Sequence, residues 1–194
     1  MRHDDVIYEA EDDEYVLRVL QDYNPQSPRE FDNFGTMLFW ISKYDLGDKH
    51  GHESAADFLE EINETNALIL SLQIYEHSEL TMSWSVFNED EIDKHDGFLY
   101  VKLNDVLKEY GRVDAETIKK AYACLEAEAE VYEQYIKGDV CCFSLVKKVK
   151  CDACGHVEEE DVNSCHGFFG YDVHKNGIAD TIGEKFNHLI DMLK

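Results

Sequence analysis

Hydrophobic residues recur along this chain at two different spacings, and the longest regular stretch is helical. Within residues 114–136 the apolar side chains are three or four positions apart: Ile118, Tyr122, Leu125, Ala129, Tyr132 and Ile136. Side chains at this spacing share one face of an α-helix. Gly138 follows the stretch, and glycine is the residue that most readily closes a helix. The pattern therefore predicts one long helix over residues 114–136 with that face buried.

Two shorter segments also have a helical spacing. Residues 54–63 carry their apolar side chains on one stripe, and so do residues 180–193 at the end of the chain. The stripes consist of Ala55, Phe58, Leu59 and Ile62 in the first segment and of Ile182, Phe186, Leu189, Ile190 and Leu193 in the second. These patterns predict a short amphipathic helix and a C-terminal helix.

Alternating or continuous apolar runs predict strands in much of the remaining sequence. The runs cover residues 6–10, 15–20, 36–42, 67–74, 80–87, 97–102, 140–149, 158–164 and 168–173. Only residues 75–79 separate two of them, so that pair is expected to form a hairpin.

The order of these segments indicates the fold class. Strands outnumber helices and most connections are short, which favours a largely antiparallel sheet with helices on one face. The sequence lacks the strand–helix alternation and the glycine-rich loop of nucleotide-binding folds. We therefore expect a single α+β domain over residues 1–194, in which a mostly antiparallel sheet is packed by the long helix and the C-terminal helix.

The charge of the chain narrows the functions open to this fold. Its 194 residues include 18 Lys and Arg against 42 Asp and Glu, a formal net charge of −24 at pH 7. A surface this negative repels nucleic acid and anionic lipid, so neither is expected to bind directly. The N-terminus is acidic, and no stretch reaches the roughly 20 apolar residues of a membrane helix. We expect a cytoplasmic protein whose 6 Cys are thiols or metal ligands.

The cysteines supply the sharpest candidate for a metal site. Cys151 and Cys154 form a C-x-x-C-G motif, a spacing that lets a tight turn aim two thiolates at one ion. Cys165 and His166 follow at a distance that a hairpin over residues 150–167 would close. Together the four residues predict a structural zinc site in a small Cys-rich hairpin. The alternative is a β-turn with two unpaired thiols.

Acidic residues cluster along the chain and indicate a protein-binding surface. One cluster lies in the predicted long helix and a second in residues 89–93, while further runs occur at residues 4–14 and 158–161. The first two clusters supply the predicted partner-binding set: Glu126, Glu128, Glu130 and Glu133, with Glu89, Asp90, Glu91 and Asp93. Such carboxylates could stand where phosphates would lie and occupy the basic groove of a nucleic-acid-binding protein. The alternative is an ordinary solvated acidic surface.

A second candidate site surrounds one of the few arginines. The guanidinium of Arg29 is expected to pair with a nearby carboxylate, such as that of Asp32 or Asp48. That ion pair would lock the loop, which is a structural role. The functional alternative is an enzyme or small-ligand site made of Arg29, Asp32, Asn33 and His77, close to Cys165. The sequence does not separate these two interpretations.

Several sequence blocks resemble a family of largely uncharacterised proteins encoded by phages and mobile elements. The blocks are SPREFDNFGTM at residues 27–37, YDLGD at 44–48, YEHS at 75–78, GFLY at 97–100, EVYEQYIKGD at 130–139 and NSCHGFFG at 163–170. In relatives the last block usually reads DSCWGF, so Asn163 and His166 depart from it. The family does not generally look like a zinc family, which argues against Cys165 and His166 as ligands.

This resemblance implies a phage or mobile-element gene and carries over no catalytic residues. Small acidic accessory proteins of such genomes often inhibit host defence systems that target nucleic acid. We therefore hypothesise a non-enzymatic accessory protein that binds a basic host protein, such as a restriction or CRISPR nuclease. Inhibition would follow from nucleic-acid mimicry or from steric occlusion of the partner's groove.

Overall fold

The structure is a computed structural model that describes residues 5–88 and 95–194, and the chain forms two compact units in it. The first, which we call the discontinuous unit, joins Met1–Gln26 to Gly138–Lys194. The second, the central unit, is Ser27–Lys137. The sequence predicts one domain because no linker-like composition interrupts the chain. The boundaries fall instead between two nearby prolines, Pro25 and Pro28, and directly after the long helix.

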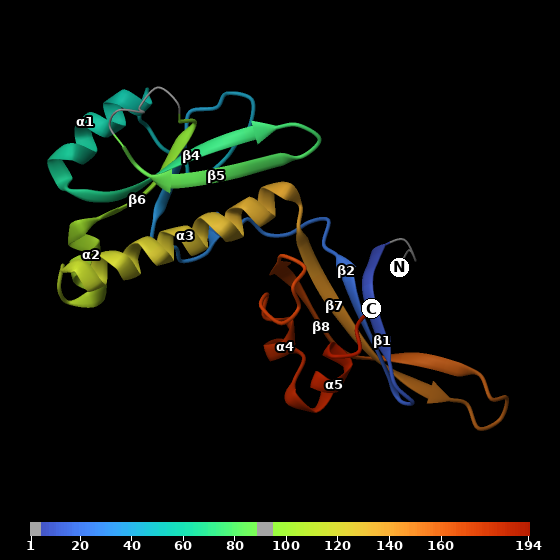
Figure 1. The fold of residues 1–194 in the computed structure, drawn as a ribbon. Coiled ribbons are helices and arrows are strands. Elements are labelled where there is room, and N and C mark those ends of the chain that lie inside the picture. The colour runs from blue at the N-terminus through green and yellow to red at the C-terminus, as the bar shows by residue number, and fades with distance from the viewer. Residues whose placement is uncertain (1–4, 89–94) are drawn as a thin grey trace. The chain divides into compact units, whose positions relative to one another are not determined.

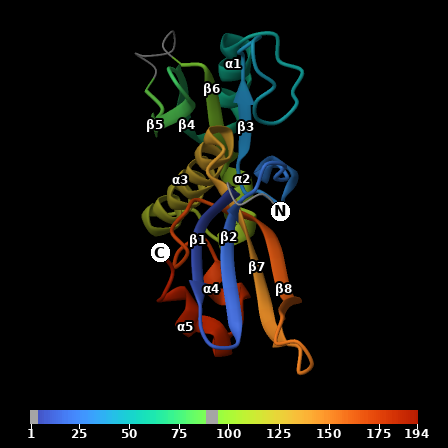
Figure 2. The ribbon, with the colours of Figure 1, turned by 90° about the vertical axis from the view of Figure 1, so that its right-hand side faces the viewer.

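The discontinuous unit is built on a four-stranded antiparallel sheet with the order β1-β2-β7-β8 (Figure 1). Its strands are β1 Val6–Glu11, β2 Tyr15–Gln21, β7 Val140–Lys150 and β8 Val157–Phe169. The N-terminal and C-terminal parts of the chain meet in this sheet where β2 pairs with β7 (Figure 2). β1 and β8 are its two edges.

The C-terminal segment covers one face of this sheet with short helical turns rather than one helix. The turns are α4 Ile178–Thr181, the 3-10 helix η4 Glu184–Phe186 and α5 Asn187–Ile190. The predicted helix over residues 180–193 is therefore wrong, because Gly183 adopts a positive φ of 98° that interrupts a helix. The apolar stripe is nevertheless buried, since Phe186 and Leu189 share a core with Leu17 and Phe143.

β8 replaces two predicted strands with one. It continues through residues 158–164 and ends at Phe169, so residues 170–173 do not belong to it. Its register with β7 shifts by one residue between Cys165 and Phe168, which marks a β-bulge. Gly167 supplies the positive φ of 80° at this position, and the strand can therefore continue across the irregularity.

The central unit contains a second four-stranded antiparallel sheet, with the order β3-β6-β4-β5. Its strands are β3 Thr36–Phe39, β4 Ala67–Glu76, β5 Leu80–Val86 and β6 Gly97–Lys102. β4 and β5 form the predicted hairpin. The two antiparallel sheets, together with the helices, confirm the predicted α+β class.

Helices pack on both faces of the second sheet. They are α1 Ala55–Thr65, α2 Leu103–Tyr110 and α3 Ala115–Lys137, and the 3-10 turn η2 Pro28–Glu30 precedes β3. α3 confirms the predicted long helix, and its Leu125 is fully buried in one core with Leu70 and Leu99. α1 packs on the opposite face, where Phe58 lies in a core with Phe98. The strands present alternate residues to the two helices.

α2 has no counterpart among the predicted elements. It begins directly after β6, and its eight residues provide little more than two turns of periodicity. No helix within residues 5–88 and 95–194 is both long and apolar enough to cross a membrane.

Candidate functional site

The open edge of the first sheet is formed by β8 and is unusually acidic. The side chains of residues 157–164 are all exposed along this strand. Four consecutive carboxylates occupy its first half: Glu158, Glu159, Glu160 and Asp161. β8 pairs only with β7, so the backbone groups on its other side lie at the end of the sheet. Among the described residues, the edge therefore combines negative charge with a strand that is paired on one side only.

One of these carboxylates is held by the fold itself. The Arg18 guanidinium donates two hydrogen bonds to Glu159, at 2.8 and 2.7 Å, and a third to Glu9 at 2.6 Å. Hydrogen bonding to Arg18 lowers the pKa of Glu159. Among the described residues, Glu158 and Glu160 make no ion pair within 4.0 Å, although Glu160 lies opposite Lys147 in the strand ladder. These two side chains remain available to a partner.

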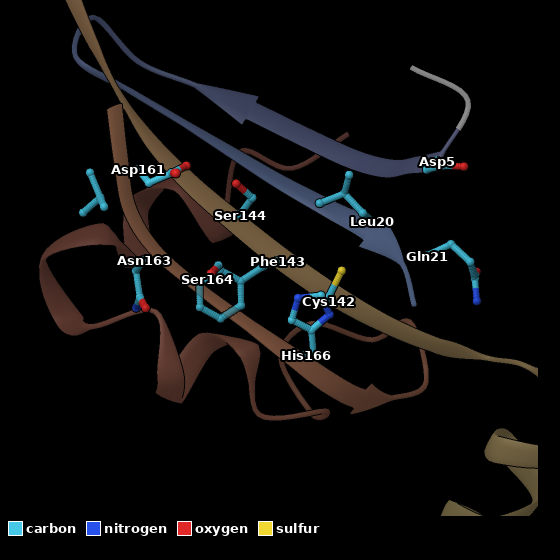
Figure 3. A pocket seen from close by; sticks show the side chains of 11 residues that line it. Asp5, Leu20, Gln21, Cys142, Phe143, Ser144, Asp161, Asn163, Ser164 and His166 are labelled. Atoms are coloured by element: carbon cyan, nitrogen blue, oxygen red, sulfur yellow. The ribbon is translucent and has the colours of Figure 1, made fainter. Parts of the chain in front are cut away.

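A groove lies beside this edge and is lined by residues of β2, β7 and β8 (Figure 3). Its volume is about 660 Å³, which is within the range of small-ligand sites. β2 and β7 contribute Leu20, Cys142 and Ser144 to its lining. β8 contributes Asp161, Val162, Asn163, Ser164 and His166. The groove is therefore half apolar and half polar, and Asp161 belongs to both the groove and the acidic edge.

A buried carboxylate lies near His166 at the end of the groove. The Asp22 side chain is 8% exposed and accepts hydrogen bonds from the backbone N–H groups of Gly167 and Asn24, each at 3.1 Å. His166 Nδ1 lies 3.7 Å from Asp22 Oδ2, while the imidazole itself is 71% exposed. This separation is longer than a hydrogen bond, and the ring stays exposed to solvent.

Cys142 does not have the properties of an activated nucleophile. Burial and the nearby charge of Asp22 raise the pKa of its thiol. Among the described residues, no hydrogen bond joins its sulfur to His166. A neutral thiol without a base is a poor nucleophile. The groove is therefore better suited to binding than to nucleophilic catalysis.

The four predicted zinc ligands do not come together. Cys151 and Cys154 lie in the turn that joins β7 to β8. Cys165 pairs with Phe143, eight residues along β8 from Val157, which is about 26 Å at 3.3 Å per residue. In the described part of the chain, no three His, Cys, Asp or Glu side chains are grouped to hold a metal ion. Zinc bound by Cys151 and Cys154 stays a prediction.

Backbone hydrogen bonds order the turn that carries these two thiols. Cys151 N–H donates to His156 C=O at 2.7 Å, and Gly155 N–H donates to Cys151 C=O at 2.8 Å. Hydrogen bonding by the backbone of Cys154 and Ala153 lowers the pKa of the Cys151 thiol. Both cysteines are exposed on this turn.

The predicted acidic face of α3 is smaller in the structure than in the sequence. Glu126 and Glu130 are exposed, whereas Glu133 is 20% exposed and lies 3.9 Å from the Lys137 ammonium. Glu128 is turned inward and accepts the backbone N–H groups of Phe34, at 2.6 Å, and of Gly35. The remaining predicted partner residues, Glu89, Asp90, Glu91 and Asp93, lie outside the described residues.

Arg29 and the inward carboxylates form a buried ion-pair network. Arg29 is 6% exposed, and its guanidinium donates to both oxygens of Asp48, at 3.0 and 2.7 Å, and to Glu128 at 3.1 Å. Burial opposes the Arg29 charge, but bonding to Asp48 and Glu128 outweighs burial, so its pKa is raised. A Cβ on Gly35 would lie 2.5 Å from Leu125, which shows how closely this loop approaches α3. The expected Arg29–Asp48 pair is confirmed, and Arg29 ties its loop to Asp48 and to Glu128 of α3.

The other residues of the predicted ligand site are not gathered around Arg29. The Asn33 amide donates to the carbonyl oxygens of Pro28 and Phe31 and so closes its own loop. Asp32 is exposed, and it lines a hollow of about 530 Å³ together with Asn33 and Lys108. His77 is exposed in the turn between β4 and β5, and no contact to Arg29 is present among the described residues.

The sequence analysis did not identify Asp22 or Cys142 as site residues. Neither belongs to a motif, and the partners of Asp22 in β8 lie about 145 positions further along the chain. Only the pairing of β2 with β7, and of β7 with β8, brings them together. Comparisons with protein-family models, with curated proteins and with solved structures find no match for this chain.

Proposed function

We propose that this chain is an acidic, non-enzymatic binding protein whose β8 edge docks onto a basic protein. The partner class is a nucleic-acid-binding host protein, such as a restriction or CRISPR nuclease in the bacterial cytoplasm. Bound along its basic groove, the chain would exclude the nucleic acid by mimicry and by steric occlusion. The observation that carries the proposal is the run of four exposed carboxylates on the open edge of the first sheet.

The charge spacing on β8 supports mimicry in particular. An extended strand rises about 3.3 Å per residue, so residues 158–161 place one carboxylate per about 3.3 Å. One strand of B-DNA carries one phosphate per about 3.4 Å along the helix axis. Successive side chains alternate between the two faces of β8, so Glu158 and Glu160 lie on one face, about 6.6 Å apart, and the 3.3 Å spacing applies to a partner that contacts both faces of the edge. A groove that accepts phosphates could therefore accept this edge over a short length.

The experiment compares two pairs of carboxylates that remove the same charge. Glu158→Gln with Glu160→Gln alters the β8 edge, and Glu126→Gln with Glu130→Gln is the matched control on α3. Each variant and the unaltered chain are used to capture proteins from a bacterial lysate at low salt. The proposal expects a captured protein that is retained by the α3 variant and lost by the β8 variant.

The captured protein is then purified and its affinity is measured across a salt series. We expect the β8 variant to bind roughly tenfold or more weakly, chiefly through slower association, and we expect duplex DNA to compete. Affinity should fall steeply as salt rises. Equal binding of the unaltered chain and the β8 variant at low salt would contradict the proposal, and so would binding that duplex DNA does not displace.

The groove beside β8 supports a second candidate, which is the binding of a small polar molecule. Its volume and its mixed lining of Leu20, Ser144, Asn163 and His166 favour this candidate. A fragment screen by NMR tests it. Chemical-shift changes confined to these residues would support a ligand site, and changes scattered over the surface would oppose it.

A further inference from the structure

The two edges of the first sheet differ in what covers them. The backbone of β1 is paired at Glu9, whose N–H donates to the Lys194 carbonyl at 3.3 Å and whose carbonyl accepts the Lys194 N–H at 3.4 Å. β8 has no such partner in the described part of the chain, where it pairs with β7 alone. An edge strand presents a row of unpaired N–H and C=O groups, so the outer side of β8 is open to a further strand.

The regular part of this open edge is residues 157–161. The register between β8 and β7 runs without a shift from Val157 to Asp161. It changes by one residue between Asp161 and Asn163, so Val162 is the extra residue of a β-bulge. Because a bulge bends the strand that contains it, an added strand would pair with residues 157–161 and would leave β8 at the bulge.

The bulge lies where β8 borders the groove. In a regular strand only alternate side chains face one side of the sheet. Here the four consecutive residues Asp161, Val162, Asn163 and Ser164 all line the groove (Figure 3). An added strand would lie about 4.8 Å from β8, so a long side chain on its groove side would reach Asp161.

The charge of the groove indicates which side chain would enter it. The described lining includes the carboxylates of Asp5 and Asp161 and contains no Lys or Arg. The exposed carboxylates of residues 158–161 give the open edge the same sign of charge. An ammonium or guanidinium group complements both features, whereas both would repel a carboxylate.

We propose that β8 receives an extended basic segment of a partner protein as an additional strand over residues 157–161, with one Lys or Arg side chain in the groove beside Asp161. Backbone hydrogen bonds then supply affinity and the groove supplies specificity, as in other proteins that bind peptides at a sheet edge. This inference rests on the proposed function, because it specifies how the β8 edge holds its basic partner. It differs from mimicry by charge alone, which needs no backbone pairing.

The test uses the full-length chain and a synthetic heptapeptide, acetylated and amidated, in which lysine and threonine alternate. Its twin carries N-methyl groups on two adjacent central residues, which removes one N–H from each edge of the peptide and keeps every charge. We expect the twin to bind roughly tenfold or more weakly by fluorescence anisotropy. Hydrogen exchange should slow at alternate amide groups of residues 157–161 with the unmethylated peptide only. Equal affinities, unchanged exchange, or no binding of either peptide at low salt would overturn the proposal.

A second measurement tests the groove. NOEs are expected between a lysine side chain of the peptide and the groove residues Leu20 and Ser144. Asp161→Asn should weaken peptide binding about fivefold, because it removes a carboxylate from the rim of the groove. Asp152→Asn is the matched control, since Asp152 is exposed in the turn between β7 and β8 and does not line the groove. Equal losses from the two variants, or the absence of these NOEs, would overturn the placement of a basic side chain in the groove.

The outcomes separate this inference from the proposed function. If a protein captured from the lysate depends on Glu158 and Glu160 while the two peptides bind equally, the inference fails and the proposed function stands. If the peptides differ as expected while no captured protein depends on these glutamates, the proposed function fails and β8 remains a site for basic strands.

Discussion

The β8 edge and helix α3 both carry runs of carboxylates, yet the two regions use them differently. On β8, Glu159 binds Arg18 at the surface, and its neighbours Glu158 and Glu160 face solvent. On α3, Glu128 lies among backbone N–H groups and Arg29 in a mostly buried network. An acidic run in a sequence therefore does not identify a surface, because single carboxylates within it can be structural. The two regions differ in whether a neighbouring loop supplies hydrogen-bond donors to the carboxylates. The loop before β3 supplies backbone N–H groups to Glu128, whereas Glu158 and Glu160 face solvent.

The largest effect is expected at Arg29, the cation of the buried network. Arg29→Met leaves Asp48 and Glu128 without their counter-charge, and breaking a buried pair in this way costs about 3–5 kcal/mol of unfolding free energy. Both tryptophans, Trp40 and Trp84, lie in the central unit, so denaturant unfolding followed by tryptophan fluorescence reports on this unit. Arg112→Met is the control, because Arg112 is 59% exposed and makes only surface ion pairs. Equal losses from the two variants would contradict the structural role of Arg29.

A smaller effect is expected at Arg18, the matching cation of the first sheet. Arg18 is 21% exposed and its two carboxylate partners are 43% exposed, so water screens the interaction. Arg18→Met should lower stability by about 1 kcal/mol, which is typical of a good bidentate pair near the surface. Hydrogen exchange of the β2 and β7 amides measures this locally. A loss as large as that of Arg29→Met would remove the contrast between the two regions.

The pH response separates the regions further. His188 Nε2 lies 2.7 Å from Asp12 Oδ2, and this hydrogen bond, with the N–H groups of Tyr15 and Glu14, lowers the pKa of Asp12 from 3.8 to about 2. Folded Asp12 binds its proton more weakly than unfolded Asp12. Its contribution to stability is therefore complete above about pH 4 and is lost as the pH falls towards 2.

NMR titration of the Asp12 carboxyl group tests this linkage. His188→Gln should raise the pKa of Asp12 towards 3.8, because its main hydrogen-bond donor is replaced by a weaker one. His77→Gln removes an exposed histidine from a turn of the central unit and should leave that pKa unchanged. An Asp12 titration that is the same in both variants would show that His188 is not the cause.

The smallest change in stability is expected for the two double glutamate variants, and its sign should differ between them. Glu126 and Glu130 are like charges four positions apart on a helix, so Glu126→Gln with Glu130→Gln should stabilise the chain by a few tenths of a kcal/mol. Glu160 lies opposite Lys147 across the strand ladder, so Glu158→Gln with Glu160→Gln should lower stability by a similar amount. Melting temperatures at low salt compare the two. Shifts in the same direction would mean that net charge, rather than local pairing, dominates both.

The long helix and most strands could be predicted because their signals are local. The spacing of Tyr122, Leu125 and Tyr132 defines one buried face of α3, and only the exact ends of the helix needed the structure. The C-terminal helix could not be predicted correctly, because a stripe of the same spacing also arises from separate turns that bury apolar residues. Gly183 was the one sign in that segment that the helix is interrupted.

The candidate site was less accessible to sequence reasoning because its contacts are distant along the chain. The Arg29–Asp48 pair spans 19 positions and was expected, whereas the Arg29–Glu128 pair spans 99 and was not. A signal for Glu128 was present, since it lies three positions after Leu125 and directly before Ala129, at the border of the buried face. Cys165 was placed near Cys151 because two strands were predicted where one continuous strand keeps them apart.

An open edge strand is also a place where identical chains can join and aggregate. β8 is 13 residues long, and two of its exposed side chains, Val157 and Val162, are apolar. If two such edges approached each other, the carboxylates of residues 158–161 would meet those of the other copy, and their repulsion opposes edge-to-edge growth. The same charges leave the backbone of the edge free for a strand of opposite charge. The acidic run therefore opposes edge-to-edge pairing between copies of the chain and still permits pairing with a basic strand.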